Sequence, residues 1–250
     1  MEKLFFLFIV VGFFAQMIDG ALGMGYGTIS AIALLSMGIP PATTSAGVHA
    51  AKIIAGGVSG IAHLRFGNVD RKLFERLLVP GILGGIAGAF TITHLSRKVV
   101  TPVVSVYLAA IGLMMFYKAV RTVTEKVVTT HIRPLALVGG FLDSAGGGWG
   151  PIVTSTLMAR GNNPRLTIGT VNLVEFFVSL AQLATLLIFL GKNDLDGVLQ
   201  VLPIIAGLIV GAMMAAPIAA YVCRKIPAQA MIIIVSVLII ALSAQTLLRR

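Results

Sequence analysis

The sequence contains a single cysteine, Cys223, among 250 residues. It therefore forms no intrachain disulfide, no cysteine-built metal site and no thiol relay within the chain. Charged residues are also scarce, at 11% of the chain, compared with about 25% in ordinary soluble domains. No stretch is long and polar enough to form a soluble domain, which argues against a receptor or a membrane-tethered enzyme with a catalytic head.

Motifs for cofactors and catalysis are lacking as well. No Gly-x-x-x-x-Gly-Lys phosphate-binding loop is present, which excludes ATP-driven pumping by this chain alone. No spacing of His, Asp and Glu resembles a metal site, and no cofactor is predicted. A hydrolase could be assembled on paper from Ser144, His49 and Asp143, but nothing beyond residue type supports it. The sequence therefore predicts a protein that is not an enzyme.

Apolar residues dominate the chain, at 57%, and the mean hydropathy is +0.99. They form continuous runs, which indicates an all-α integral membrane protein; a β-barrel would show alternating segments of about ten residues. The net charge is +10, but the basic residues lie at the ends of the apolar runs. This placement is typical of positive-inside topology signals in a multi-pass protein, and a nucleic-acid partner is not predicted.

Two glycine-rich stretches, residues 18–27 and 142–150, have the same design. In each, an apolar run stops at an Asp, glycines follow, and an aromatic residue is flanked by glycines. Glycine unwinds a helix readily, and unwound backbone in a membrane must be buried or line a wet cavity. Two such breaks in matching positions point to a transporter's binding site. In the alternative interpretation, the glycines only permit close helix packing.

The breaks belong to a longer internal repeat, which predicts residues 1–119 and 134–250 as two homologous transmembrane halves joined by a linker at 120–133. Lys52 and Glu175 are 123 residues apart, and the two aspartates are 124 apart. The residues that pair at a separation of 123 include Gly38 with Gly161, Pro41 with Pro164, Thr44 with Thr167, Gly84 with Gly207, and Gly88 with Gly211.

Full spans are expected at residues 44–64, 73–95, 99–119, 167–190, 198–222 and 228–248. The second of these carries a small-residue stripe suited to tight helix contact, Gly81, Gly84, Gly85 and Gly88. Each half opens with either a re-entrant hairpin, which makes the halves inverted, or a broken span, which makes them parallel. Counting Lys and Arg by side does not decide between these topologies. The short limbs before the breaks favour the re-entrant, inverted arrangement.

Ionisable residues at membrane depth are costly and are functional candidates by default. Lys52 and Glu175 lie inside apolar spans at equivalent positions, so they are expected to meet near the centre. In the functional interpretation Lys52 attracts an anionic substrate, while Glu175 balances its charge or carries a proton. In the structural interpretation the two form a self-neutralising buried ion pair. Both can hold for one pair.

Further candidates surround this pair. His49 lies one turn before Lys52, and its equivalent is Asn172; Gln16, Asn172 and Gln182 are weaker candidates of the same kind. Helices that restart after each break offer N-terminal backbone donors to an anion, and the aspartates can cap those helices or bind a proton or cation. The candidate substrate-binding residues are Lys52, His49, Gly25, Tyr26, Gly27, Gly148, Trp149, Gly150 and Asn172, and the candidate proton-coupling or charge-balancing residues are Glu175, Asp19 and Asp143.

The chain resembles the TauE/SafE family of sulfite exporters and toluene-sulfonate uptake permeases over nearly its whole length. The resemblance rests on Asp-Gly-Ala-Leu-Gly-Met-Gly-Tyr-Gly at 19–27, Gly-Ile-Pro-Pro-Ala at 38–42, Ser-Ala-Gly-Val-His at 45–49 and Gly-Gly-Gly-Trp-Gly-Pro at 146–151. It implies a secondary transporter of small sulfur-containing anions, such as sulfite, sulfoacetate or other organosulfonates, usually in a prokaryotic inner membrane.

The alternative function is a cation- or proton-coupled transporter or channel for other small solutes, which would use the intramembrane carboxylates Asp19, Asp143 and Glu175 as acceptors. The expected partners are the lipid bilayer and a small anionic substrate. A homo-oligomer is compatible with the sequence. The exact substrate, the direction of transport and the coupling ion are not determined at this level.

Overall fold

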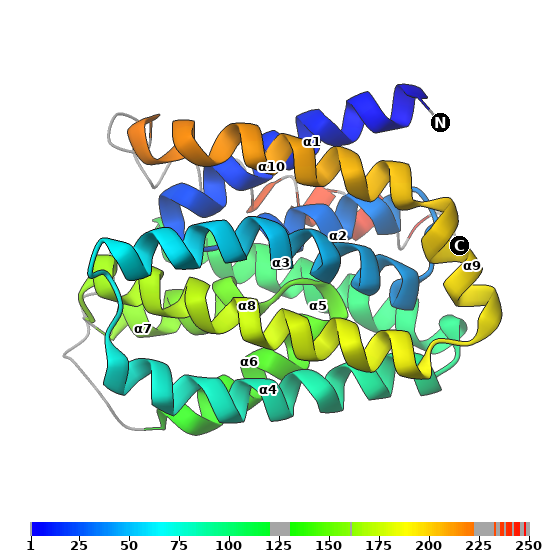
Figure 1. Ribbon diagram of the computed structural model, residues 1–250. Coiled ribbons are helices and arrows are strands. Elements are labelled where there is room, and N and C mark those ends of the chain that lie inside the picture. Colours follow the sequence, from blue (N-terminus) through cyan, green and yellow to red (C-terminus); the bar gives the residue numbers. More distant parts are fainter. Residues whose placement is uncertain are drawn as a thin grey trace.

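The computed structural model describes residues 2–120, 131–160 and 162–222, together with single residues and short groups between 233 and 248. All regular secondary structure in these residues is helical (Figure 1). The elements are α1 (Glu2–Leu22), α2 (Tyr26–Ser36), α3 (Pro41–Arg65), α4 (Arg71–His94), α5 (Arg97–Val120), α6 (Ile132–Gly146), the π-helical turn η1 (Gly150–Thr154), α7 (Ser155–Ala159), α8 (Pro164–Phe189), α9 (Lys192–Gln200) and α10 (Leu202–Val222).

Local sequence signals explain where the helices begin. α3 and α8 both begin at a proline, Pro41 and Pro164, whose missing N–H is not needed in the first turn. Asp70 caps α4 by accepting hydrogen bonds from the backbone N–H groups of Lys72 and Leu73, at 2.9 and 3.1 Å. An asparagine side chain caps α8 in the same way.

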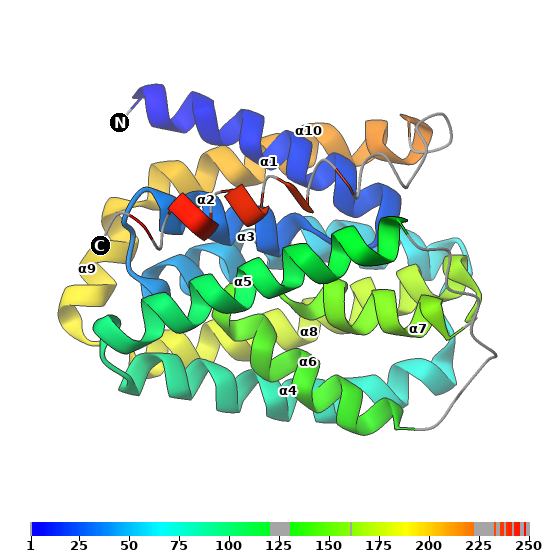
Figure 2. The ribbon, with the colours of Figure 1, turned by 180° about the vertical axis from the view of Figure 1, so that it is seen from behind.

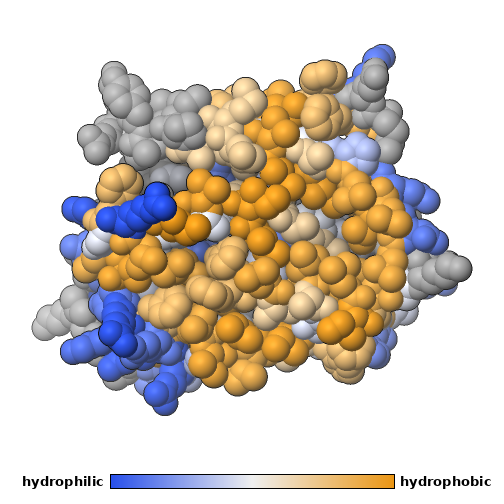
Figure 3. Space-filling view, viewed as in Figure 1, coloured by the Kyte–Doolittle hydropathy of each residue, from blue (hydrophilic) through white to orange (hydrophobic). Residues whose placement is uncertain are grey.

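Within the described residues, four helices are long and apolar enough to cross a membrane: Lys3–Gly20, Arg71–His94, Lys98–Tyr117 and Arg165–Phe189. Many of their large apolar side chains point outward; Phe14 and Val103 are both 61% exposed. In Figure 3 a broad apolar band crosses the visible face, and hydrophilic residues gather at its two ends. Lipid is the solvent that suits such a surface. The predicted helical membrane protein is therefore confirmed.

The helix breaks lie slightly later in the chain than predicted. α1 and α6 do not stop at Asp19 and Asp143 but continue for about one more turn. They end at glycines in the left-handed conformation, Gly23 with φ 65° and Gly147 with φ 72°. A left-handed residue ends a helix, and glycine adopts this conformation without the steric penalty of a Cβ. These glycines therefore decide the break, and the aspartates remain inside the helices.

The unwound backbone is limited to residues 23–25 and 147–148. α2 begins at Tyr26 and η1 at Gly150, so both returning segments begin earlier than predicted and Gly27 lies within a helix. α2 runs back toward the end of the molecule where α1 begins (Figure 1), and η1 with α7 runs back in the same way beside α6 (Figure 2).

The long helices pack in pairs that join the two sequence halves. α1 lies along α10, α4 along α6 and α3 along α8, and α3 and α8 run in opposite directions (Figures 1 and 2). Glycines allow two of these contacts. A Cβ on Gly84 or Gly88 would overlap the backbone of α6. A Cβ on Gly207 or Gly211 would overlap the backbone of α1. The predicted tight packing of the glycine stripe is therefore confirmed.

One predicted span was wrong at its start. Residues 198–222 do not form a single helix, because α9 ends at Gln200 and α10 begins at Leu202. Pro203 has no N–H to continue the helix of α9, which explains the interruption. The span predicted at 228–248 falls mostly outside the described residues, as do residues 121–130 of the predicted linker. The division of the chain into the two halves and a linker remains a prediction.

Candidate functional site at the two helix breaks

Each unwound segment contacts the start of the other half's returning segment. A Cβ on Gly27 would lie 2.7 Å from the Cα of Gly147, and a Cβ on Gly150 would lie 2.7 Å from the Cα of Met24. Residues 27 and 150 are 123 apart, and so are residues 24 and 147. The two contacts are therefore equivalent in the two sequence halves. Only glycine fits at these crossings, since any side chain would collide with backbone atoms.

Each aspartate bridges its own break in the same manner. Asp19 Oδ1 accepts a hydrogen bond from the backbone N–H of Tyr26 at 3.3 Å, and Asp143 Oδ1 accepts one from that of Trp149 at 2.9 Å. The aspartates therefore bind N–H groups at the start of the returning segments, which is the capping contact that the sequence predicted. The carboxylates also orient the two returning segments relative to α1 and α6.

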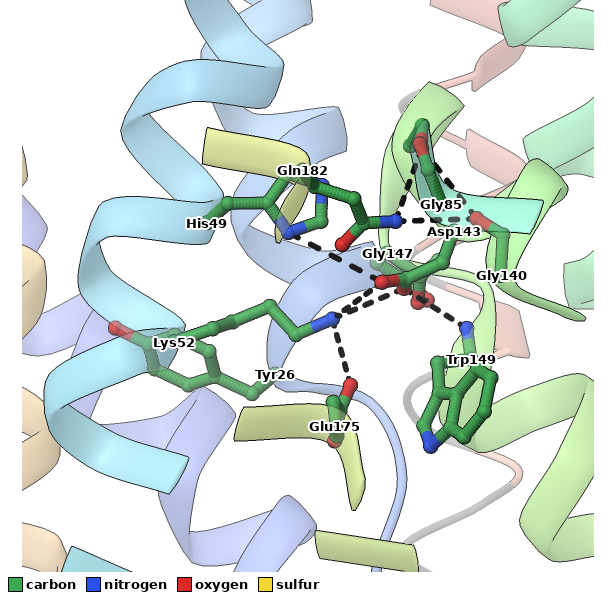
Figure 4. A network of polar contacts seen from close by, with 12 residues as sticks. Tyr26, His49, Lys52, Gly85, Gly140, Asp143, Gly147, Trp149, Glu175 and Gln182 are labelled. Carbon is green, nitrogen blue, oxygen red and sulfur yellow. Dashed lines mark hydrogen bonds and ion pairs between the residues drawn. The ribbon is translucent and has the colours of Figure 1, made fainter. Parts of the chain in front are cut away.

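Lys52 projects from α3 between two carboxylates (Figure 4). Its Nζ lies 2.9 and 3.1 Å from the two carboxylate oxygens of Asp143, and 2.6 Å from Glu175 Oε1. Lys52 is 4% exposed and Asp143 is fully buried. The predicted meeting of Lys52 and Glu175 is confirmed. A Cβ on Gly27 would lie 3.3 Å from Nζ, so the first break directly adjoins this cluster.

The sequence did not predict the bond between Lys52 and Asp143. Asp143 was assigned to its own break, and nothing in the chain indicated that α6 brings it against α3. The signal that predicts the bond is geometric: when the two breaks cross, the aspartate of one break approaches a helix of the other half. Ser45, two turns before Lys52 on α3, confirms this proximity by donating a hydrogen bond to the carbonyl of Ser144 at 2.7 Å.

His49 faces the same cluster, as predicted from its position one turn before Lys52. It is 1% exposed, and its Nδ1 lies 4.0 Å from Asp143 Oδ2 (Figure 4). Asn172, its equivalent in α8, is 3% exposed and donates from Nδ2 to Ser59 Oγ at 3.2 Å. His49 Nδ1 and Asn172 Oδ1 are buried and have no hydrogen-bond partner within the described part of the chain.

A second polar network holds the end of α6. Ser144 Oγ donates to the carbonyl of Gly85 at 2.9 Å and accepts from Gln182 Nε2 at 2.9 Å. Gln182 also donates to the carbonyl of Gly140 at 3.1 Å (Figure 4). Thr28 Oγ1 donates to the carbonyl of Gly147 at 2.8 Å. The sequence indicated Gln182 only as a weaker candidate residue and gave no signal for Thr28, because neither residue belongs to a motif.

The two aromatic residues at the breaks are held by distant helices. The Tyr26 hydroxyl donates to the carbonyl of Leu208 in α10 at 3.2 Å, and it points away from the Lys52 ammonium (Figure 4). Trp149 is fully buried, and its Nε1 donates to the carbonyl of Val171 in α8 at 3.3 Å. Their backbone N–H groups, which bind the aspartates, are thus nearer to the site than their ring polar atoms.

Two further glycines that were predicted to bind substrate, Gly25 and Gly148, also have structural roles. Gly25 has φ 121°, a conformation that side chains rarely adopt. A Cβ on Gly148 would overlap the hydroxyl of Tyr107, a residue of α5. Gly25 therefore requires glycine for its backbone conformation whether or not a ligand binds there, whereas a side chain at residue 148 would first have to displace the Tyr107 hydroxyl.

The charges at the site do not balance. One ammonium, that of Lys52, is in contact with the carboxylates of Asp143 and Glu175, and the Asp19 carboxylate also interacts electrostatically with these three groups. Uncompensated charge at membrane depth is expensive, so these groups are candidates for a functional role.

Buried charges where two helix breaks cross, inside an apolar helical protein, are features of a transporter's binding site. The structure thus defines a helical membrane transporter. The chain belongs to the Sulfite exporter TauE/SafE family, which matches residues 8–246. It is 37% identical over 257 residues to "Probable membrane transporter protein YtnM" of Bacillus subtilis (strain 168), an alignment that covers 99% of this chain and 84% of that protein. No solved structure matches the chain.

Proposed function

We propose that the protein is a secondary transporter of small sulfur-containing anions, such as sulfite, sulfoacetate or other organosulfonates, and that Lys52 anchors the anion. The observation that carries the proposal is the buried Lys52 ammonium beside the crossing of the two breaks. In a poorly hydrated site an ammonium attracts an anion far more strongly than it does in water. The family's description as sulfite exporters supports a sulfur oxyanion.

The two halves of the chain are inverted repeats in this proposal, each opening with a re-entrant hairpin. Three observations support it: the equivalent glycine crossings, the matching aspartate bonds, and the opposite directions of α3 and α8. Inverted repeats allow alternating access by motion of one bundle against the other around a central site. The protein then lies as a multi-pass transporter in a prokaryotic cell membrane.

Transport is coupled to protons through competition for Lys52. When Asp143 and Glu175 are both ionised, both carboxylates form ion pairs with the Lys52 ammonium. The three side chains then carry one net negative charge, which repels an anion. A proton on Glu175 removes one competitor, and the anion takes its place opposite Lys52. Glu175 is the better proton carrier because Asp143 is also held by the Trp149 N–H, whereas the Glu175 side chain is 14% exposed. Anion and proton therefore move together.

The test is flux into proteoliposomes that contain the purified protein. The panel contains sulfite, sulfate, thiosulfate, sulfoacetate, taurine and acetate, each with and without a pH gradient. We expect saturable flux of one sulfur anion that increases with an inward proton gradient. Lys52→Gln removes the anchor and abolishes this flux, whereas Lys72→Gln, at an exposed position, leaves it unchanged. A folded Lys52→Gln variant with normal flux overturns the anchoring role.

A second candidate function follows from the excess of carboxylates over ammonium groups at the site. Asp19, Asp143 and Glu175 could serve a cation- or proton-coupled transporter or channel of other small solutes. This function predicts no flux of any sulfur anion and a response to a cation gradient instead. It also predicts that a folded Lys52→Gln variant keeps its activity, so the same two measurements distinguish the candidates.

A further inference from the structure

The ion cluster around Lys52 is closed in one direction along α3 and α8. Toward the start of α3, the helix face that carries Lys52 continues with His49 and Ser45, and both are buried. Toward the end of α8, the face that carries the glutamate of the cluster continues with Ser179 and Gln182, which are fully buried. The start of α3 and the end of α8 lie at the same end of the molecule (Figure 1). The cluster is therefore sealed from that end.

The opposite direction, toward the end of α3 and the start of α8, is more open. Gly56 and Ser59 follow Lys52 at intervals of four and three residues, so they share its helix face. Both are half-buried, although this face is turned toward α8 inside the bundle. Within the cluster, the Glu175 side chain is 14% exposed and that of Asp143 is fully buried. Glu175 is thus the carboxylate of this pair that solvent touches.

Open space lies between α3 and α8 next to Glu175. Lys52 contacts Glu175 at 2.6 Å, and seven residues later Ser59 accepts a hydrogen bond from Asn172 at 3.2 Å. Gly56 lies between these two contacts on the same face, and a Cβ built on it would meet no atom within 4 Å. A Cβ on either of the other two glycines in this segment of α3 would meet atoms of α8 at 3.2 Å. The space is therefore local to Gly56 and bounded by helix contacts.

This space does not belong to the lipid-facing surface. The exposed apolar side chains of this part of α3 are Ile54, Val58 and Ile61. In a helix of 3.6 residues per turn, these positions lie about 140–160° around the axis from Gly56. Gly56 thus faces the interior of the bundle, where open space suits water and small solutes rather than a lipid tail.

The end of the molecule on the open side is strongly basic. It contains the end of α3 and the starts of α4, α6 and α8 (Figures 1 and 2). Its described basic residues include Arg65, Arg71, Lys72, Arg76, Arg133 and Arg165. Those described at the opposite end are Lys3, Arg97, Lys98 and Lys192. Lys and Arg are in excess on the cytoplasmic side of membrane proteins, so the open side is the cytoplasmic one.

We infer that solutes reach Lys52 from the cytoplasm, between the end of α3 and the start of α8, and that the missing side chain of Gly56 keeps this entrance open. A solute that enters here meets Glu175 before Asp143, and Glu175 exchanges its proton with the cytoplasm by the same route. The inference rests on the proposed function only for the identity of the solute. The position of the entrance can be measured without any transported anion.

The experiment is cysteine accessibility. Ser45 and Ser59 are a matched pair, because they lie seven residues before and after Lys52 on one face of α3. Each is replaced by cysteine in a Cys223→Ser background, which removes the chain's only cysteine. A membrane-impermeant methanethiosulfonate is added to inside-out and right-side-out membrane vesicles without substrate. We expect Ser59→Cys to react at least about tenfold faster than Ser45→Cys, and to do so in the inside-out vesicles.

Two results overturn the entrance: equal reaction rates for Ser45→Cys and Ser59→Cys, or reaction of Ser59→Cys in right-side-out vesicles alone. If Ser59→Cys does not fold, Gly56→Cys takes its place, since a Cβ there meets no atom. If Ser45→Cys does not fold, Ser179→Cys serves as the buried control.

Filling the space gives a second readout. Gly56→Leu should abolish flux in proteoliposomes while the midpoint of thermal unfolding stays near that of the unmodified protein. Val58→Leu, which adds bulk on the lipid-facing side of the same helix, leaves flux unchanged. Normal flux through folded Gly56→Leu overturns the entrance.

The outcomes separate the inference from the proposed function. Reaction of Ser59→Cys from the cytoplasmic face, in a protein that transports no sulfur anion, supports the entrance and contradicts the proposed function. Flux of a sulfur anion, together with reaction of Ser59→Cys from the outer face alone, overturns the entrance and leaves the proposed function standing.

Discussion

The first and second helix breaks have the same backbone arrangement but differ in the charged side chains that face them. Both end at a left-handed glycine, and in both an aspartate binds the N–H of an aromatic residue across the gap. Yet Asp143 faces the ammonium of Lys52, whereas the corresponding helix position near Asp19 is occupied by Glu175. The comparison shows that the same backbone arrangement can hold different charges, because a single exchange of Lys for Glu changes the groups that face each break.

The largest expected effect comes from disrupting the backbone contact between the two helix breaks. Gly147→Val places a Cβ against the backbone of Gly27 and forces a β-branched residue into φ 72°. Overpacking and backbone strain typically cost about 1–3 kcal/mol each, so we expect little folded protein. The measurement is the yield and thermal unfolding midpoint of the purified variant in detergent.

Gly56→Ala is the control for that variant. Gly56 lies inside α3, and a Cβ there would meet no atom within 4 Å. Replacing a helical glycine by alanine should stabilise the protein by about 0.5–1 kcal/mol. Normal stability of Gly147→Val would mean that the two breaks are farther apart than the structure places them.

A smaller effect should separate the two aspartates. Asp143→Asn leaves the buried Lys52 with a single carboxylate, and breaking a buried pair typically costs about 3 kcal/mol or more. Asp19→Asn removes a carboxylate with no ion-pair partner among the described residues, so we expect a change below about 1 kcal/mol. Thermal unfolding of both variants in detergent measures the difference.

An exposed ion pair serves as the reference for this comparison. Glu75→Gln breaks the Arg71–Glu75 pair, whose side chains are 91% and 61% exposed, and should change stability by less than about 0.5 kcal/mol. Equal losses from Asp143→Asn and Asp19→Asn would contradict the difference in charge between the two breaks.

The two aromatic residues at the breaks are expected to have smaller effects than Asp143→Asn. Trp149→Phe leaves a cavity in a fully buried position and removes the bond to Val171, at a cost of about 2 kcal/mol. Tyr26→Phe keeps the ring and removes only the hydroxyl that binds the Leu208 carbonyl, at a cost of about 1 kcal/mol. The readout is again the unfolding midpoint, and a larger loss for Tyr26→Phe would reverse the expected order.

Much of the site was predictable because its residues follow local rules. The glycine breaks, the glycine stripe of α4 and the isolated ionisable residues are all visible in the order of amino acids. The meeting of Lys52 with Glu175 followed from their equal positions in a repeat. Helix ends were less predictable, because Asp19 and Asp143 tolerate helical backbone and the left-handed glycines that end the helices look like any other glycine.

By itself, the sequence determined the chemical inventory: an apolar helical chain with two glycine-broken segments and few buried charges. Apolarity and glycine content act locally, so they can be interpreted without coordinates. Only the tertiary structure decided that Lys52 pairs with Asp143 as well as Glu175, and that Asp19 has no ion-pair partner among the described residues. Electrostatic contacts require approach to a few ångströms, and here the crossing of two breaks more than a hundred residues apart decides which charges approach.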